Sequence, residues 1–262
     1  MLNFSRLKIL RFLALLLIIL PLHAAEPVQY LAVGTLLPVM LNSNLDSDKS
    51  KPGEKITAKL KQDVSLPDGG VVKSGAELFG HIVSVKRGTE TTGSSVVFIF
   101  DQIRVGGQTH SIGTGLRALA SMAAVFQARQ PINSVALDGS SLWDYNTRQI
   151  GGDIVFGRKN VQSNDGVVGM SPEPGWVVGI PKANPDAGCD APENKGIQAF
   201  WLFSTNACGV YGDDNEDMQI SRKPSDNKDG QITLTSPKRV LVRGGGGLLL
   251  TVIPQAVPQS VK

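Results

Sequence analysis

Two histidines lie downstream of the first 25 residues, and they are the side chains best suited to general acid–base chemistry here. They are His81 and His110, with the carboxylate Asp101 between them in the sequence. A histidine base and an orienting carboxylate are two parts of a hydrolase triad. Both histidines fall in strand-like patterns, where such a residue usually has a structural role. A hydrolase with an unusual site is therefore kept only as an alternative.

The other catalytic patterns in the chain do not fit known chemistry. No Gly-x-Ser-x-Gly occurs, and Ser225–Lys228 overlays a Ser-x-x-Lys on a Ser-Asp-Asn that β-lactam-recognising enzymes keep apart. The glycine run 244–247 lacks the Gly-Lys-Ser/Thr of a phosphate loop and predicts a turn. We therefore predict no catalytic residue and no cofactor.

One acidic stretch, Asp213–Asp217, begins like a calcium-binding EF-hand loop. Position six of such a loop is glycine and position twelve is glutamate, but here they are Met218 and Pro224. An EF-hand is thus excluded. A looser calcium site stays open as the alternative to a solvated acidic loop, and we predict no metal.

All three tryptophans, Trp143, Trp176 and Trp201, lie in the second half of the chain. If exposed, their rings would stack on sugars, which makes a glycan-binding module the second alternative function. Packing in a core is the favoured interpretation, because most large aromatic side chains are buried.

The first 25 residues have the three parts of a secretory signal peptide. Three basic residues lie before residue 12, an apolar run covers Phe12–Leu22, and His23-Ala24-Ala25 supplies small residues for cleavage. The run is shorter than the roughly 20 residues that span a bilayer, so a retained anchor is the less favoured alternative. We expect export and cleavage after Ala24 or Ala25, giving a periplasmic or secreted protein.

Removal of this segment changes the charge balance. The chain has 26 Lys and Arg against 23 Asp and Glu, and three of the cations, Arg6, Lys8 and Arg11, lie in the leader. The remaining 23 cations equal the 23 anions. Because nucleic-acid binding needs clustered positive charge, a nucleic-acid partner is not expected.

The two cysteines, Cys189 and Cys208, are predicted to form a disulfide in an oxidising compartment. Closing a loop of this size stabilises a fold by about 3 kcal/mol in the chain-entropy model. Two buried free thiols are the alternative.

Short apolar runs separated by Gly, Pro, Asn and Asp predict an all-β fold. Residues 56–61 and 77–86 alternate as half-buried strands should. The sequence predicts further strands at 35–41, 63–66, 71–75, 95–105, 108–112, 150–156, 176–180, 198–204, 218–221, 231–234, 239–242 and 248–253.

A single short helix is expected at 115–129, because Leu116, Leu119, Ala120, Ala123 and Phe126 recur at helical spacing. Thr114 would cap it, and Pro131 follows its end.

We predict four parts of the chain. They are a signal peptide at 1–25, a barrel-like domain at 26–129, a β-rich domain at 130–253 and a disordered tail at 254–262.

Several motifs in the first half carry a resemblance to a known family. They are Gly34-Thr35-Leu36-Leu37-Pro38-Val39-Met40-Leu41, Leu45-Asp46-Ser47-Asp48, Gly53–Leu60, Asp63-Val64 and Val72–Gly80. Their order resembles the β-barrel domain of TrbI-like channel subunits of bacterial type IV secretion systems, over residues 31–115. The resemblance implies a related barrel. It does not imply a secretion channel, because the family's retained membrane helix, proline-rich linker and long two-helix insert have no counterpart. Residues 143–253 are similar to uncharacterised exported bacterial proteins.

These observations favour a non-enzymatic protein of a Gram-negative cell envelope with a structural or protein-binding role. Its expected partners are other envelope proteins, and no membrane-spanning segment is expected after leader cleavage.

Overall fold

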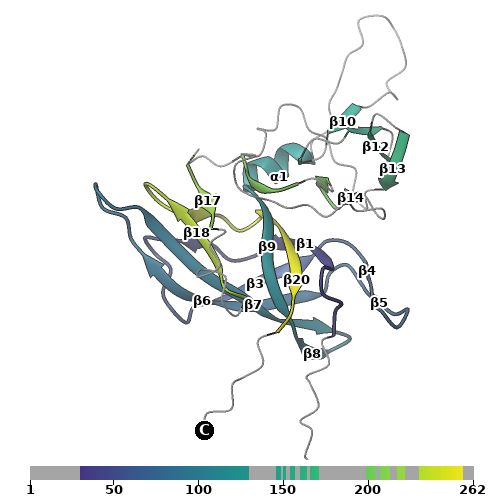
Figure 1. Ribbon diagram of the computed structural model, residues 1–262, viewed down its shortest axis with the longest axis horizontal. Helices are drawn as coiled ribbons and strands as arrows, with labels where there is room; N and C mark the ends of the chain where they lie inside the picture. The colour runs from purple at the N-terminus through teal and green to yellow at the C-terminus, as the bar shows by residue number, and fades with distance from the viewer. Residues whose placement is uncertain are drawn as a thin grey trace, which may run out of the picture.

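The computed structural model describes residues 30–129, 146–148, 150–151, 154–156, 160–163, 166–170, 199–204, 207–212, 217–221 and 230–255 (Figure 1). Strands dominate this part of the chain, and α1 is its one helix. The predicted all-β fold class is therefore confirmed.

Five antiparallel strands from the first half, each predicted from the sequence, form half of one ten-stranded sheet in the described part of the chain. They are β1 (Leu36–Leu41), β3 (Lys55–Leu60), β6 (Glu77–Lys86), β7 (Ser94–Val105) and β8 (Gln108–Ser111). Along β3 the apolar residues Ile56, Ala58 and Leu60 are buried, while Lys55 and Lys59 are exposed. One face of the sheet is thus directed at the core, as the period of two requires. The short strands β2 (Leu45–Asp46), β4 (Val64–Ser65) and β5 (Val71–Val72) lie in the connections.

The helix predicted at 115–129 is wrong in its first half. Residues Gly113–Ala120 form strand β9, and α1 covers only Met122–Ala128, with Ser121 rather than Thr114 as its N-cap. The Ser121 Oγ accepts a hydrogen bond of 3.1 Å from the Ala124 N–H. Strand β9 is buried on both faces, so its apolar run lacks the alternation that identifies a strand.

Strand β9 and four strands from the end of the chain complete the same sheet. The four are β16 (Gly209–Tyr211), β17 (Gln219–Ile220), β18 (Ile232–Ser236) and β20 (Gly247–Ile253), and β19 (Leu241–Val242) lies between β18 and β20 in the sequence. The strand order is β16-β9-β20-β1-β3-β6-β7-β18-β17, with β8 beside β7, while β19 pairs with β2. Strand β20 lies between β1 and β9 and is antiparallel to both. Strands β18 and β20, from the predicted second domain, thus belong to the same sheet as the strands of the first half.

The sheet curves back toward itself at one corner. The Ile112 N–H donates 2.9 Å to the Asp101 carbonyl, and the Thr114 hydroxyl donates 2.8 Å to the Phe100 carbonyl. These bonds join the start of β9 to β7, although four strands separate the two in the sheet order. The paired strands end at β16 and β17 and do not close into a barrel.

Buried apolar residues form two clusters, one on each face of β9 and β20. Leu119, Leu248 and Leu250 belong to the main core inside the curved sheet. Ala118, Ala120 and Leu249 point the other way, into a second cluster with residues of α1 and of 199–211. Figure 1 shows α1 close to the end of β9 and the start of β20. We call the cluster that contains Ala118, Ala120, Leu249 and residues of α1 and of 199–211 the second apolar cluster.

Smaller sheets occur in the remaining described segments. One contains β10 (Asn146–Arg148), β11 (Ile154–Phe156), β12 (Asn160–Ser163) and β13 (Gly166–Met170), and the other is the hairpin β14 (Ala199–Phe200) with β15 (Phe203–Ser204). The predicted strand at 176–180 lies outside the described residues. In the described part of the chain, no helix has the length and apolar character needed to cross a bilayer.

Candidate functional site

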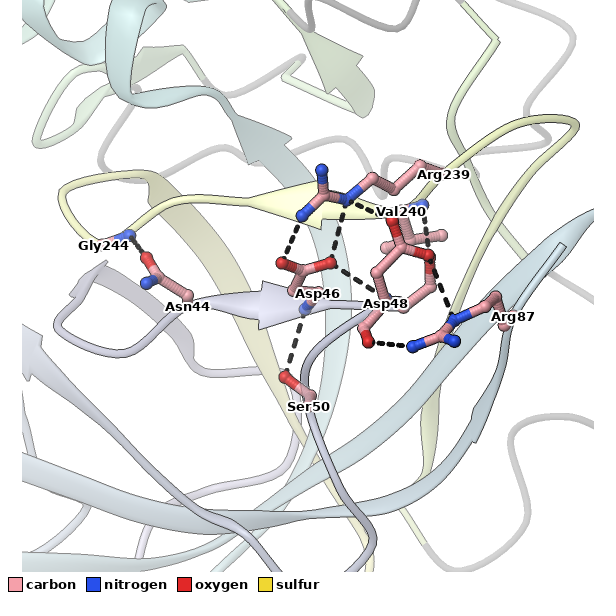
Figure 2. A network of polar contacts seen from close by, with 9 residues as sticks. Asn44, Asp46, Asp48, Ser50, Arg87, Arg239, Val240 and Gly244 are labelled. Atoms are coloured by element: carbon pink, nitrogen blue, oxygen red, sulfur yellow. Dashed lines mark hydrogen bonds and ion pairs between the residues drawn. The ribbon is translucent and has the colours of Figure 1, made fainter.

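A network of polar contacts joins residues 46–50 to residues 239–244 (Figure 2). Strand β2 pairs with β19, which places Asp46 opposite Leu241. Asp48 follows β2, Arg239 precedes β19, and Arg87 begins the loop between β6 and β7. We call Asp46, Asp48, Arg87 and Arg239 the ion-pair cluster.

Arg239 binds both aspartates. Its Nε lies 2.9 Å from Asp46 Oδ1 and its Nη2 lies 2.5 Å from Asp46 Oδ2, a two-point contact. The same Nε is 3.1 Å from Asp48 Oδ2. Arg87 completes the cluster, with its Nε 3.6 Å from Asp48 Oδ1 and an Nη2 hydrogen bond to the Asp48 carbonyl. Two cations thus balance two anions, and each links different segments of the chain.

Backbone hydrogen bonds hold the ion-pair cluster in place. The Asp48 N–H donates 2.9 Å to Asp46 Oδ1, and the Asp46 N–H donates 3.2 Å to the Ser50 Oγ. Ser47 and Val240 exchange two bonds, from the Ser47 N–H to the Val240 carbonyl and from the Val240 N–H to the Ser47 Oγ. These contacts orient the Asp46 carboxylate toward Arg239.

The electrostatics identify Asp46 as the central residue. Only 6% of its side chain is exposed, against 35% for Arg239. Burial alone would raise the pKa of Asp46, but the hydrogen bonds from Arg239 and from the Asp48 N–H, with the Arg239 charge, hold its pKa below the usual 3.8. The carboxylate is therefore ionised at neutral pH, and its partners make it a structural anchor rather than a proton donor.

Replacing Asp46 by asparagine is expected to lower the free energy of unfolding by about 2–3 kcal/mol, because Arg239 loses a charge-assisted two-point contact. Urea unfolding followed by circular dichroism measures the loss. Glu77→Gln is the matched control, because the Glu77–Arg104 pair is about half exposed and such pairs contribute about 0–1 kcal/mol. Equal losses for the two variants would contradict an anchoring role for Asp46.

Stability is also expected to depend on pH through Asp46. Its pKa is lower in the folded chain than in the unfolded chain, so its stabilising contribution is complete above about pH 4. The contribution is lost as the pH falls through the folded pKa. Unfolding titrations between pH 7 and pH 2 are expected to show a smaller acid-induced loss in Asp46→Asn than in the unsubstituted chain. Parallel curves for the two proteins would contradict this assignment.

A glycine turn carries the chain from the ion-pair cluster to the second apolar cluster. The Gly244 N–H donates 2.8 Å to Asn44 Oδ1, next to β2. Gly245 has a φ of +91°, which favours glycine. A Cβ on Gly247 would lie 3.2 Å from both the Trp201 and the Phe203 rings. Glycine is thus favoured at position 245 by the backbone conformation and at position 247 by the close packing of the two rings.

Trp201 is the largest side chain of the second apolar cluster. It is fully buried and has a φ of +53°, which is unusual for a residue other than glycine. The backbone N–H of Trp201 donates 2.6 Å to Gln62 Oε1, and the Lys61 ammonium lies 5.6 Å from the indole ring centroid. Residues just after β3 therefore hold the β14–β15 turn against the sheet.

The hydrolase candidates His81, Asp101 and His110 lie on the adjacent strands β6, β7 and β8, but no polar contact joins their side chains in the described residues. His81 lies on β6 opposite Ile99, while the His110 ring on β8 stacks on Tyr30 with centroids 3.8 Å apart. Asp101 uses its carbonyl to bond Ile112. Within the described residues no hydrogen bond or ion pair joins these three side chains, and no three His, Cys, Asp or Glu side chains are grouped as metal ligands.

Of the three tryptophans considered for glycan binding, the structure describes one, Trp201. Burial of Trp201 leaves no ring face for a sugar, so its assignment to a glycan site is wrong. Trp143 and Trp176 lie outside the described residues. So does Cys189, and its pairing with Cys208 stays a prediction.

The ion-pair cluster was not predicted from the sequence. Asp46 and Arg239 are 193 residues apart, and no local pattern connects them. The Asp-Ser-Asp run at 46–48 in a turn was a signal for local hydrogen bonding, but not for its arginine partners. No protein-family model matches the chain, and no curated protein is similar to it.

Proposed function

We propose that this chain is an exported protein of a Gram-negative cell envelope that binds other envelope proteins and has no catalytic role. The leader-like first 25 residues support the location. The all-β fold and the ion-pair cluster support a structural role, because Asp46, Asp48, Arg87 and Arg239 link distant segments of the chain to one another.

The exposed face of α1 is the observation that carries the binding role. Phe126 and Met122, one helical turn apart, are 63% and 45% exposed. Ala124, Val125 and Ala128 on the other side of α1 are buried in the second apolar cluster. Two large apolar side chains thus stand on a helix that is anchored to the sheet. Exposed apolar groups on a rigid support are typical of protein-binding surfaces.

Two finer features belong to the same proposal. The bonds from Ile112 to Asp101 and from Thr114 to Phe100 favour a barrel-like enclosure, in line with the TrbI-like resemblance. A Cys189–Cys208 disulfide is the covalent link expected in the periplasm.

Pull-down of the tagged protein from the periplasm, with quantitative mass spectrometry, tests the binding role. The double variant Met122→Ser/Phe126→Ser is expected to lose at least tenfold of its specific envelope partners. Val71→Ser is the control, because Val71 is also exposed but lies on β5, in a different segment. Unchanged recovery with the double variant, or no envelope partner with any variant, would overturn the proposal.

A further inference from the structure

Three neighbouring strands turn one face away from the main core. Strand β6 pairs with β3 on one side and with β7 on the other. Buried residues such as Ile56, Leu78 and Phe98 point into the core, so the residues that alternate with them point outward. Charged, amide and aromatic side chains are among these outward residues. We call six of them the outer polar face: Lys55, Lys59, Glu77, Phe79, Gln102 and Arg104.

The strand register places three cations around the Phe79 ring. Lys59 lies opposite Glu77, and Glu77 lies opposite Arg104, so one row crosses all three strands. Phe79 is the next outward residue of β6, and Lys55 lies opposite the one after it. At a rise of about 3.3 Å per residue, the two lysines are about 13 Å apart along β3. Arg104 is two strand spacings, about 10 Å, from Lys59. The cations are therefore spread widely enough to meet several anionic groups of one extended ligand.

The Arg104 guanidinium is already held in position. Its central carbon lies 4.5 Å from the Phe79 ring centroid, and its Nη1 lies 3.2 Å from Glu77 Oε2. The Arg104 side chain is nevertheless 49% exposed. Glu77 engages one nitrogen of a planar group that carries several N–H donors, so the other donors can bind a second carboxylate. Because the guanidinium is held beforehand, less entropy is lost when a ligand binds.

The charge of the outer polar face complements an anion. Its three cations exceed its one carboxylate, Glu77. Lys55 and Lys59 are exposed, and neither forms an ion pair with another described residue. An anionic ligand therefore reaches both lysines without displacing a partner.

The chemistry of the face favours a sugar polymer over a protein. Since β6 lies between β3 and β7, a peptide strand cannot add beside Phe79 by backbone hydrogen bonds. Protein interfaces are depleted in lysine and glutamate at their centres, whereas both occur here. A sugar ring instead presents an apolar face to Phe79 and hydroxyls to the Gln102 amide, and a carboxylate on the sugar pairs with the cations.

We propose that the outer polar face binds an acidic polysaccharide, with sugar carboxylates on Lys55, Lys59 and Arg104 and a sugar ring beside Phe79. The face belongs to β3, β6 and β7, whereas the protein-binding role rests on α1. The site therefore goes beyond the proposed function, and the two share only the expected export of the chain.

Calorimetric titration with polygalacturonate, a polymer of carboxylate-bearing sugars, tests the site. The unsubstituted chain should bind this polymer at low salt and should not bind neutral dextran. Lys55→Gln/Lys59→Gln should weaken binding at least tenfold, because two charge-assisted contacts are lost. Lys49→Gln/Lys238→Gln is the matched control, since both lysines are exposed in loops beside the ion-pair cluster and the change in net charge is the same. This control should weaken binding less than twofold.

Three results of the titrations would overturn the proposal. One is equal weakening in the two double variants, which would indicate general charge attraction, and another is no binding by the unsubstituted chain. A polyglutamate peptide and a single-stranded oligonucleotide serve as polyanions that lack carboxylated sugars. Binding of either as tightly as polygalacturonate is the third such result.

Nuclear magnetic resonance locates the site without a substitution. Adding a galacturonate oligosaccharide to the isotope-labelled chain should shift the amide signals of residues 55–59, 77–81 and 99–104 and leave those of α1 unchanged. The variant Met122→Ser/Phe126→Ser should bind the polymer as the unsubstituted chain does, so the two surfaces are tested separately. Shifts centred elsewhere, or loss of polymer binding in that variant, would contradict a site on the outer polar face.

Discussion

Replacing Gly80 by alanine is expected to be the most destabilising single-methyl change in the sheet. Gly80 lies on β6 opposite Phe100 of β7, where the register of the two strands shifts. A Cβ there would be 1.8 Å from the Ile99 carbonyl oxygen and 2.8 Å from its carbon. Backbone atoms cannot move aside as a flexible side chain would, so the β6–β7 ladder must separate. We expect a loss of about 4 kcal/mol or more.

Urea unfolding of Gly80→Ala against Gly53→Ala measures this effect. Gly53 has a φ of +80° in an exposed turn, and no heavy atom within 4 Å of its Cβ position. Its replacement carries only the conformational cost, about 1–2 kcal/mol. A Gly80→Ala variant no less stable than Gly53→Ala would show that β6 and β7 do not approach so closely.

Truncating Trp201 to alanine is the second large expected effect. The indole is fully buried, and a Cβ on Gly247 of β20 would lie 3.2 Å from it. It packs edge to face with the Phe203 ring, with the two ring centroids 6.3 Å apart. Removing a buried aromatic ring of this size typically costs about 3–5 kcal/mol. Loss of the near-ultraviolet dichroism of the aromatic residues, with retained far-ultraviolet signal, would report detachment of the second apolar cluster from the sheet.

Two comparisons separate the roles of the Trp201 side chain and backbone. Trp201→Gly should be about 1 kcal/mol more stable than Trp201→Ala, because glycine adopts the φ of +53° without strain. Phe126→Ala should change stability by less than about 0.5 kcal/mol, because Phe126 is largely exposed. A loss for Phe126→Ala as large as that for Trp201→Ala would contradict the assignment of Trp201 to the core.

The sheet of the first half follows from local patterns. In β3 and β6, burial on one face leaves a period of two that the sequence retains, and Asp68, Gly69 and Gly70 mark the turn after β4. Strand β9 was assigned to a helix because it is covered on both faces. Leu116, Leu119 and Ala120 then satisfy helical spacing as well as they satisfy a buried strand.

Features that depend on distant residues were not predicted. The apolar run of β20 indicated a strand, but nothing local placed it between β1 and β9, more than a hundred residues away from each. Likewise, no local pattern indicated that Asp46 and Arg239 form an ion pair. Burial of Trp201 agrees with the favoured interpretation of core packing, and its positive φ reflects tertiary contacts with Gln62 and Lys61 that outweigh local preference.

Intact-mass analysis of the protein from separated periplasmic and cytoplasmic fractions tests whether the chain is exported and cleaved. We expect a periplasmic chain lacking residues 1–24 or 1–25, with Cys189 and Cys208 resistant to alkylation until reductant is added. An intact chain in the cytoplasm with both thiols alkylated would contradict export, the disulfide and the envelope role together.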